Sequence, residues 1–275
     1  MITSPAAIHT GAPSGLGGPK QREMLEVRSV SKSFGGMIAV DAVSASVQRG
    51  EIVGLIGPNG AGKTTMFNLI AGSLRPSSGR IVLNGEPIET APAYARIRLG
   101  LGRTFQIPRP FAAMTVLENV LFAAQRQTGE RMLPNWLMPG RVAGEERRNV
   151  EKAMSLIELV TLGRLAREPA RVLSGGQRKL LELARLLMAD PEIILLDEPA
   201  AGVNPTLLEV IVKKIAEINR RGVTFLIIEH NMALVSQLCG RVLVMASGRI
   251  LCEGTPGEVR RDPRVIEVFL GGALA

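Results

Sequence analysis

The chain has 275 residues, with 33 Lys+Arg against 25 Asp+Glu, and its formal net charge is +8. An apolar fraction of 46% supplies a full hydrophobic core and excludes a wholly disordered chain. Aromatic residues make up only 3%, which argues against a carbohydrate groove or a base-stacking surface.

The first ordered element is expected near Met24. Residues 1–23 are rich in Gly, Pro, Ala and Ser and predict a flexible tail outside the fold. Apolar and polar residues then alternate over Met24–Val30, as in a half-buried strand. The apolar run Ile52–Ile56 predicts a second strand, and a glycine-rich turn leads from it into a helix over Lys63–Ala71. Together they predict a strand–loop–helix unit.

The middle of the chain predicts helices without a strong strand. Helical periodicity covers Thr115–Gln127 and Glu145–Val160, and Pro134, Pro139 and Gly140 separate the two segments. This region differs from the flanking sequence, where strands and helices alternate. The simplest architecture is a parallel α/β core with an inserted helical subdomain.

Further strands are expected in the last third. The runs Ile193–Leu196 and Val223–Ile228 are continuously apolar, as in strands buried on both faces of a parallel sheet. An amphipathic helix lies between them and is predicted to start at Asn204, with Pro205 in its first turn. Ser247-Gly248 indicates the turn of a final hairpin.

The chain offers little for disulfide or zinc chemistry. Its two cysteines, Cys239 and Cys252, cannot form a disulfide framework, and His9 and His230 have no ligand spacing around them. No apolar run reaches the roughly 18 residues that span a bilayer, and the N-terminus does not resemble a secretory signal. We therefore expect a cytoplasmic protein in a reducing compartment. The basic surplus between residues 96 and 185 is read as a solvated face, and no nucleic-acid partner is expected.

The glycine-rich turn after the second strand matches a phosphate-binding motif in full. Gly57–Thr64 reads G-x-x-x-x-G-K-[ST] between a predicted strand and a predicted helix, the context that this motif requires. Its glycines let backbone N–H groups curl around phosphate oxygens, and the helix N-terminus adds partial positive charge. Lys63 is expected to reach the β- and γ-phosphates, Thr64 to bind Mg²⁺, and Thr65 to add a phosphate contact.

Two more segments suit anion and metal chemistry. Asp197 and Glu198 end a buried strand, where ligands of α/β sheets gather; Asp197 is placed to hold Mg²⁺ and Glu198 to act as general base. Leu173-Ser174-Gly-Gly-Gln177 precedes a predicted helix from Gln177 to Ala189. Ser174 and Gln177 fit a capping box, and a capped helix start with two glycines is also an anion site.

These three motifs, in this order and at these spacings, resemble those of ATP-binding cassette (ABC) ATPases over nearly all of residues 24–270. The resemblance implies an α/β P-loop NTPase (RecA-like) core with a mixed sheet, plus an inserted α-helical subdomain. The ABC ATPase domain would cover 24–275, with 24–106 and 178–275 as the core and 107–177 as the subdomain with the signature loop. It also implies ATP hydrolysis with ATP and Mg²⁺ as ligands.

The resemblance assigns a role to each site residue. Glu198, His230 and Gln106 would be catalytic, with Gln106 sensing Mg²⁺ and the attacking water and His230 contacting the γ-phosphate; as an alternative, His230 caps the following helix. Phe34 would stack on adenine, or belong to the core instead. The metal ligands would be Thr64, Gln106 and Asp197. The expected nucleotide contacts are Phe34, Asn59, Gly60, Ala61, Gly62, Lys63, Thr64, Thr65, Ser174, Gly175 and Gly176.

One departure points to a subfamily. Many ABC ATPases read Ser-Ala-Leu-Asp where this chain has Ala201-Gly-Val-Asn204, so that Asn204 is expected to act only as a helix cap. The surrounding sequence, together with Ile228-Glu-His-Asn-Met232, is similar to that of ATPase subunits of branched-chain amino acid importers; urea and short-chain amide importers use similar subunits.

The resemblance implies several partners. We expect a homodimer or a heterodimer with a related subunit, membrane permease subunits that hold the protein at the inner face of the membrane, and a periplasmic substrate-binding protein indirectly. The coupling groove is expected near residues 106–111. The alternative is a soluble non-transport ABC ATPase that remodels an assembly complex or acts on nucleic acid; a nucleotide-binding regulator without turnover is disfavoured by Glu198.

Overall fold

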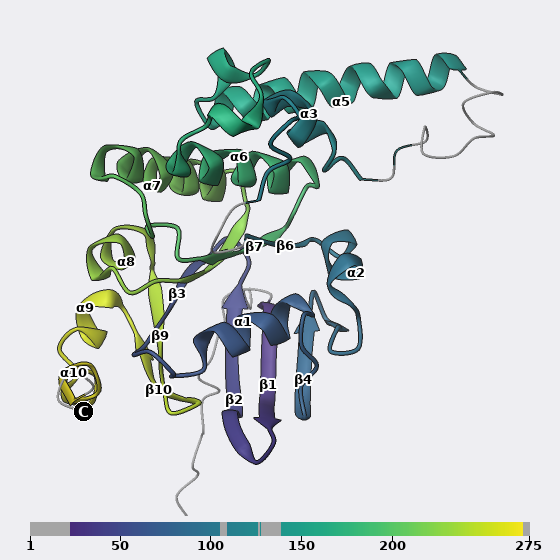
Figure 1. The fold of residues 1–275 in the computed structure, drawn as a ribbon. Helices are drawn as coiled ribbons and strands as arrows, with labels where there is room; N and C mark the ends of the chain where they lie inside the picture. The colour runs from purple at the N-terminus through teal and green to yellow at the C-terminus, as the bar shows by residue number, and fades with distance from the viewer. Residues whose placement is uncertain (1–22, 105–108, 126, 128–138, 272–275) are drawn as a thin grey trace, which may run out of the picture.

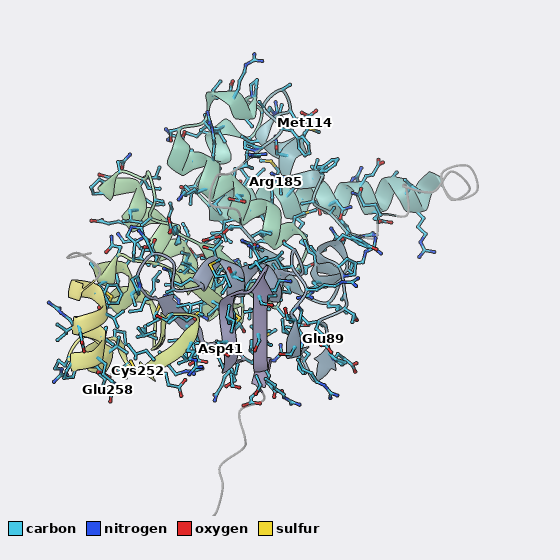
Figure 2. The ribbon with its side chains drawn as sticks, turned by 60° about the horizontal axis from the view of Figure 1, so that its bottom comes forward. Asp41, Glu89, Met114, Arg185, Cys252 and Glu258 are labelled. Atoms are coloured by element: carbon cyan, nitrogen blue, oxygen red, sulfur yellow. The ribbon has the colours of Figure 1, made fainter. Side chains whose placement is uncertain are left out.

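The computed structural model describes residues 23–104, 109–125, 127 and 139–271. Two sheets and a set of helices form its layers, and the long helix α5 projects from one end (Figure 1). Figure 2 places Met114 and Arg185 on the helical side of the molecule, and Asp41 and Glu89 on the side of the smaller sheet.

The smaller sheet is antiparallel and has the strand order β2-β1-β4-β5. Its members are β1 (Glu23–Phe34), β2 (Met37–Gln48), β4 (Ser78–Leu83) and β5 (Glu86–Pro87). The sequence predicts only Met24–Val30 within β1 and none of the other three strands. β1 and β2 shift register at several points, and Ser29 and Ala42 are left-handed at two of them. These irregularities interrupt the two-residue period that identifies a strand.

The larger sheet carries the predicted site and has the order β10-β9-β3-β8-β7-β6. It is parallel from β9 to β6, and β10 pairs antiparallel with β9 across the Ser247-Gly248 hairpin, so that the sheet is mixed as expected. Its strands are β3 (Ile52–Ile56), β6 (Leu101–Arg103), β7 (Ile193–Asp197), β8 (Thr224–Ile228), β9 (Arg241–Ala246) and β10 (Arg249–Gly254).

Alternate residues of the parallel strands enter two different cores. On β3, Val53 and Leu55 pack toward helix α1 and the antiparallel sheet, while Ile52 and Ile56 pack toward the helices of the opposite face. Ile193 and Ile194 divide in the same way. Burial on both faces explains why these strands are continuously apolar in sequence.

The helices have the following bounds. They are α1 (Lys63–Ala71), α2 (Ala93–Arg98), α3 (Val116–Leu121), α5 (Pro139–Leu159), the 3₁₀ turns η2 (Gly163–Leu165) and η3 (Ala170–Val172), α6 (Gly175–Met188), α7 (Pro205–Arg220), α8 (Met232–Leu238), α9 (Pro256–Val259) and α10 (Pro263–Gly271). No helix within the described ranges is long and apolar enough to cross a bilayer.

Several helix ends differ from the sequence prediction. Helix α3 ends at Leu121 rather than Gln127, and the exposed ring of the next residue, Phe122, packs edge-on against Phe111. Helix α5 begins at Pro139 rather than Glu145. The prediction that Pro139 and Gly140 separate two helices was wrong, because proline is compatible with the first turn of a helix, where its missing N–H has no intrahelical acceptor.

The capping predictions are confirmed. The Ser174 hydroxyl oxygen accepts the backbone N–H of Gln177, and Oε1 of Gln177 accepts the backbone N–H of Ser174. Helix α6 therefore begins at Gly175, two residues before the predicted start. Asn204 accepts the Leu207 N–H at 2.9 Å with Pro205 as the first residue of α7. These caps fix where the two helices start next to the site.

Candidate functional site

The phosphate loop joins β3 to α1 and is packed tightly at its two ends. Gly57 and Gly62 have φ values of 152° and 97°, and a Cβ would lie 2.1 Å from the Met245 carbonyl oxygen at the first and 2.4 Å from the Ala39 carbonyl oxygen at the second. Gly60, with φ of 77°, faces open space. Glycine is therefore required at both ends by neighbouring backbone, while the tip at Gly60 leaves room for a ligand.

The tip of the loop and the start of α1 present backbone donors. Asn59 and Gly60 are exposed, whereas the Ala61 methyl group is buried and its carbonyl accepts the Gly248 N–H at 3.1 Å. The Met66 N–H bonds back to the Gly62 carbonyl, and helix geometry leaves the earlier amides of this turn, including those of Thr64 and Thr65, without an intrahelical acceptor. Such a helix start binds anions.

Lys63 lies across the loop and near two carboxylates. Its Nζ donates to the carbonyl oxygens of Gly57 at 2.9 Å and Pro58 at 2.8 Å. Burial lowers the pKa of Lys63, and the charges of Glu198 and Asp197 oppose this shift. The ammonium group is thus held between the loop and the end of β7, where a bound phosphate would need a counter-charge.

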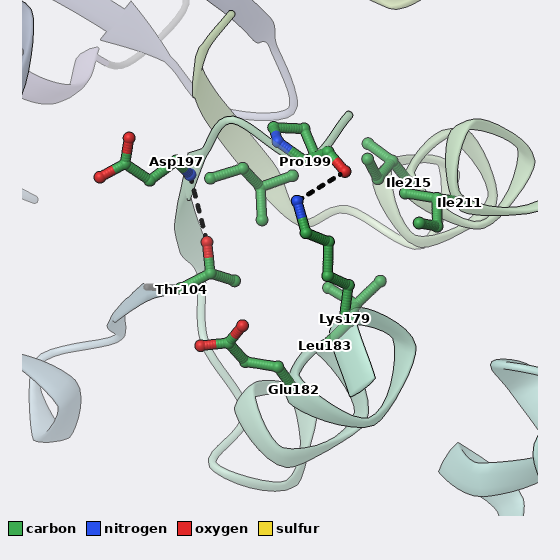
Figure 3. Close-up of a pocket in the computed structure, with 9 residues that line it drawn as sticks. Thr104, Lys179, Glu182, Leu183, Asp197, Pro199, Ile211 and Ile215 are labelled. Atoms are coloured by element: carbon green, nitrogen blue, oxygen red, sulfur yellow. Dashed lines mark hydrogen bonds between the residues drawn. The ribbon is translucent and has the colours of Figure 1, made fainter. Parts of the chain in front are cut away.

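Asp197 ends β7 in a largely buried position. Its Oδ2 is 3.2 Å from Nη2 of Arg103, whose Nη1 donates to Asn68 Oδ1 at 2.6 Å. The backbone N–H of Asp197 donates to the Thr104 hydroxyl at 3.2 Å (Figure 3). Arg103 therefore neutralises the carboxylate that the sequence assigns to Mg²⁺.

Glu198 follows in an uncommon backbone conformation. Its φ is 47°, a left-handed value that side chains other than glycine rarely adopt. The N–H of Glu198 donates to the Ile228 carbonyl at 3.0 Å, and its Oε1 lies 3.8 Å from Nδ1 of His230. The general-base candidate Glu198 and the γ-phosphate-contact candidate His230 thus face each other across the ends of β7 and β8.

His230 is exposed and does not cap the following helix. The cap of α8 is Asn231, whose Oδ1 accepts the N–H groups of Ala233 and Leu234. The alternative role considered for His230 was therefore wrong, and its imidazole is available to a ligand.

A common cleft connects several of these groups. It has a volume of about 800 Å³, within the usual range for ligand sites. Its lining includes Thr64, Arg103, Arg109, Phe122, Arg185 and Asp197. A hydroxyl and a carboxylate are the oxygen donors that Mg²⁺ prefers, and with the amides of α1 and Lys63 nearby the described residues fit a Mg²⁺–nucleotide. Gln106 lies outside the described residues.

The signature segment, Leu173–Gln177, makes its contacts at the start of α6 and with the loop before α7. Ser174 is exposed and bonds to Gln177, and Gly175 is exposed beside the loop that precedes α7. Gly176 is buried against Leu207, where a Cβ would lie 2.2 Å from Cδ2. Among the described residues, no hydrogen bond or ion pair joins Ser174, Gly175 or Gly176 to Lys63.

Phe34 is a surface residue. Its side chain is 43% exposed, and Nζ of Lys32 lies 5.2 Å from the ring centroid. The alternative that placed Phe34 in the core was wrong, and stacking on adenine stays a prediction.

Two site residues were missed by the sequence analysis. Lys179 donates to the carbonyl oxygen of Glu198 at 2.8 Å and to that of Pro199 at 3.1 Å, and Figure 3 shows the second of these bonds. Glu229 is a buried carboxylate next to His230. Both side chains bond to backbone atoms, and because every residue has a backbone, such contacts produce no recognisable motif in the sequence. The one available signal for Glu229 was a charged residue directly after a continuously apolar strand.

The family models and the related proteins point to the same family. The family model described as "ABC transporter" matches residues 40–201, and one described as "Branched-chain amino acid ATP-binding cassette transporter" matches residues 249–275. The chain is 41% identical over 249 residues to a probable branched-chain amino acid transport ATP-binding protein LivG of Archaeoglobus fulgidus, covering 90% of this chain and 96% of that protein. It is 39% identical over 251 residues to the high-affinity LivG protein of Escherichia coli K12, covering 91% and 98%.

Solved structures agree with this. A nucleotide-free ATP-binding cassette from an ABC transporter has a TM-score of 0.78 at 38% identity, covering 90% of this chain and 99% of that one. A second cassette, in its ADP conformation, has the same TM-score at 37% identity, covering 91% and 99%.

Proposed function

Because the chain belongs to the ABC transporter family and is an ATP-hydrolysing subunit of that type, we propose that it drives import of branched-chain or other small amino acids through a separate permease. The names of its relatives and the match of residues 249–275 support this substrate class. In this proposal the subunit is held at the inner face of the membrane by the permease. A soluble assembly ATPase, the other function considered, has no specific observation in its favour.

The observation that carries the mechanism is the convergence of Lys63, Asp197, Glu198 and His230 at the ends of adjacent strands. The amides of α1 and Lys63 would bind the phosphates. Thr64, Asp197 and Gln106 would hold Mg²⁺, which neutralises phosphate charge when bound. Arg103 would first release Asp197, with which it pairs in this structure.

Glu198 and His230 would act side by side, one on the attacking water and the other on the reacting phosphate. Glu198 would accept a proton from the attacking water as general base. His230, 3.8 Å from that carboxylate, would donate a hydrogen bond to the γ-phosphate and orient it. The end of β7 and the end of β8 would thus supply the base and the phosphate contact.

We propose that each nucleotide is shared between two subunits, in a homodimer or a heterodimer. The exposed Ser174 and Gly175 would contact the γ-phosphate bound by the opposite subunit. Single cysteines placed at Gly60 and Gly175, in a background without Cys239 and Cys252, should link two chains when ATP is present. Crosslinks within one chain only would contradict the shared site.

The permease would dock at the cleft between the core, assigned to 24–106 and 178–275, and the helical subdomain 107–177. Phe111 and Phe122 pack edge-on with ring centroids 4.7 Å apart, and the guanidinium of Arg185 lies 5.4 Å from the Phe111 centroid. Exposed rings beside a cation suit an apolar permease segment that carries an acidic side chain. A periplasmic binding protein would take part only through the permease.

The test is reconstitution in proteoliposomes with a candidate permease and binding protein from the same organism. ATP-dependent uptake of labelled leucine, lost in Lys63→Ala, would support the proposal. Uptake of urea or an amide without leucine would reassign the substrate. Purification with a soluble scaffold or nucleic acid, and without a permease, would favour the non-transport alternative.

A further inference from the structure

Glu229 is a fully buried carboxylate between two segments of the site. It follows β8 directly and is 0% exposed. Its Oε1 accepts the N–H of Ala200 at 2.8 Å, and its Oε2 accepts the N–H groups of His230 at 2.9 Å and Asn231 at 3.0 Å. One side chain therefore joins the loop after β7 to the backbone of His230.

The loop that Glu229 holds contains the strained Glu198. A left-handed conformation outside glycine persists only where the surroundings impose it. Here Lys179 donates to the carbonyl oxygens of Glu198 and Pro199 from α6, while Glu229 fixes Ala200 from the other side. Burial lowers the pKa of Lys179, and the charge of Glu229 is the largest of those that oppose this shift.

The two oxygens of Glu229 thus control two groups that act together. Through Oε1 the carboxylate fixes the loop of Glu198, and through Oε2 it fixes the backbone of His230. These side chains face each other at 3.8 Å. A shift of either loop would change that separation without changing the phosphate loop.

We propose that Glu229 is a positioning residue for ATP hydrolysis, which sets His230 relative to Glu198 through one buried carboxylate. The inference rests on the roles proposed above for Glu198 and His230. A purely structural carboxylate would stabilise the fold without acting through His230, and this difference is measurable.

Glu229→Gln is the sharpest substitution because it keeps the size of the side chain. A glutamine has one acceptor oxygen, and its NH₂ group can only donate. Whichever way the amide turns, it places N–H donors against the backbone N–H of Ala200 or against those of His230 and Asn231. One of the two connections is lost while the other can remain.

The experiment measures kcat and KM for ATP in the purified chain, under conditions where the parent turns over, for Glu229→Gln, His230→Ala and the double variant. We expect Glu229→Gln to lower kcat by about 10- to 100-fold, the usual effect of removing a positioning contact. The KM should change by less than about threefold, because Glu229 does not touch the phosphate loop. In the His230→Ala background, the same substitution should lower kcat by a smaller factor than in the parent, because only the hold on the Glu198 loop remains to be lost.

Thr224→Val is the matched control. Thr224 is also buried on β8, at the opposite end of the strand, where its hydroxyl accepts the Gly50 N–H at 2.9 Å. This variant should lower the melting temperature and leave kcat unchanged. If Glu229→Gln is recovered unfolded, Glu229→Asp, which keeps two acceptor oxygens at a shorter reach, replaces it under the same criteria.

The outcomes distinguish a failure of the role proposed for Glu229 from a failure of the proposed function. An unchanged kcat in Glu229→Gln, or equal losses with and without His230, would overturn the inference while leaving the proposed function intact. Parental turnover in His230→Ala would overturn the role proposed for His230 and the inference with it. A kcat loss in Thr224→Val as large as that in Glu229→Gln would assign the effect to general stability and overturn the inference.

Discussion

Alanine substitutions at Gly62 and Gly60 should differ in their cost although both lie in the phosphate loop. At Gly62 the φ of 97° places a non-glycine residue in the left-handed region, and the new Cβ would lie 2.4 Å from the Ala39 carbonyl oxygen. The left-handed region costs about 1–2 kcal/mol and overpacking about 1–3 kcal/mol. Alanine also restricts the unfolded chain, which returns about 0.4–1 kcal/mol, so that we expect a net loss of about 2–4 kcal/mol.

Gly60 is the internal control for this prediction. Its φ of 77° carries the same conformational cost, but nothing lies within 4 Å of the new Cβ. The net loss should be about 1 kcal/mol or less. Because this Cβ would project into the space assigned to the phosphates, Gly60→Ala should instead weaken ATP binding more than its stability loss suggests.

Urea unfolding of both variants without nucleotide, compared with the parent, measures the difference directly. Omitting nucleotide matters because a bound ligand adds its own stabilisation. Midpoints should shift without a change in the slope, and Gly62→Ala should be the less stable variant by about 2 kcal/mol. Equal stabilities, or a larger loss at Gly60, would refute the assignment of the close contact at Ala39.

Three further predictions concern catalysis, nucleotide binding and thiol chemistry. Glu198→Gln should retain nucleotide binding and lose turnover by about 10²–10⁴-fold, as measured by phosphate release; normal hydrolysis would mean that another group activates the water. Phe34→Ala should weaken ATP binding by about 1–3 kcal/mol in calorimetry with little change in unfolding, because the ring is 43% exposed; equal affinity would contradict stacking. Burial raises the pKa of Cys239 to about 12, so that its thiolate fraction at pH 8 is about 10⁻⁴ and the partly exposed Cys252 should be alkylated first, as mapped by mass spectrometry. Faster labelling of both thiols is expected as pH rises, and equal rates for the two at pH 8 would contradict the burial of Cys239.

The parts of the fold that sequence predicts well have strong local signals. The strand Ile52–Ile56 and the helix Lys63–Ala71 were predicted with the bounds that the structure shows. Strands buried on both faces produce apolar runs, and the loop between these two elements has a required pattern of glycines. Each signal is complete within about 20 residues and does not depend on distant partners.

The missed strands depend on long-range pairing. β6 has only three residues and is held in the sheet by pairing with β7, where Leu101 faces Ile193, 92 positions later in the chain. β2 carries buried Val40, Val43 and Val47, and the step of three residues from Val40 to Val43 breaks the two-residue period of a regular strand. Such elements are defined by their neighbours, which a local window does not contain.

The same distinction applies to the site. Motifs identify Lys63 and Glu198 because phosphate and water chemistry require those side chains at fixed positions. Glu229 bonds to Ala200, 29 residues earlier, and Lys179 bonds to carbonyl oxygens 19 and 20 residues later. Any residue type can supply a backbone N–H or carbonyl group, so that the sequence does not reveal these contacts and only the structure does.

The position of β3 in the larger sheet also limits how early during synthesis this sheet can fold. Ile52 pairs with Phe225 on one side and Val53 with Arg241 on the other. The strand that carries the phosphate loop therefore has no neighbour in its sheet until synthesis has entered the last quarter of the chain. Loop closure over this separation is slow compared with local helix formation. At a translation rate of about 5–20 residues per second, the emerging chain spends on the order of ten seconds with both edges of β3 open. A ribosome stalled after β7 would therefore hold a nascent chain that cannot form its ATP site and that exposes a bare apolar strand to chaperones or to other nascent chains.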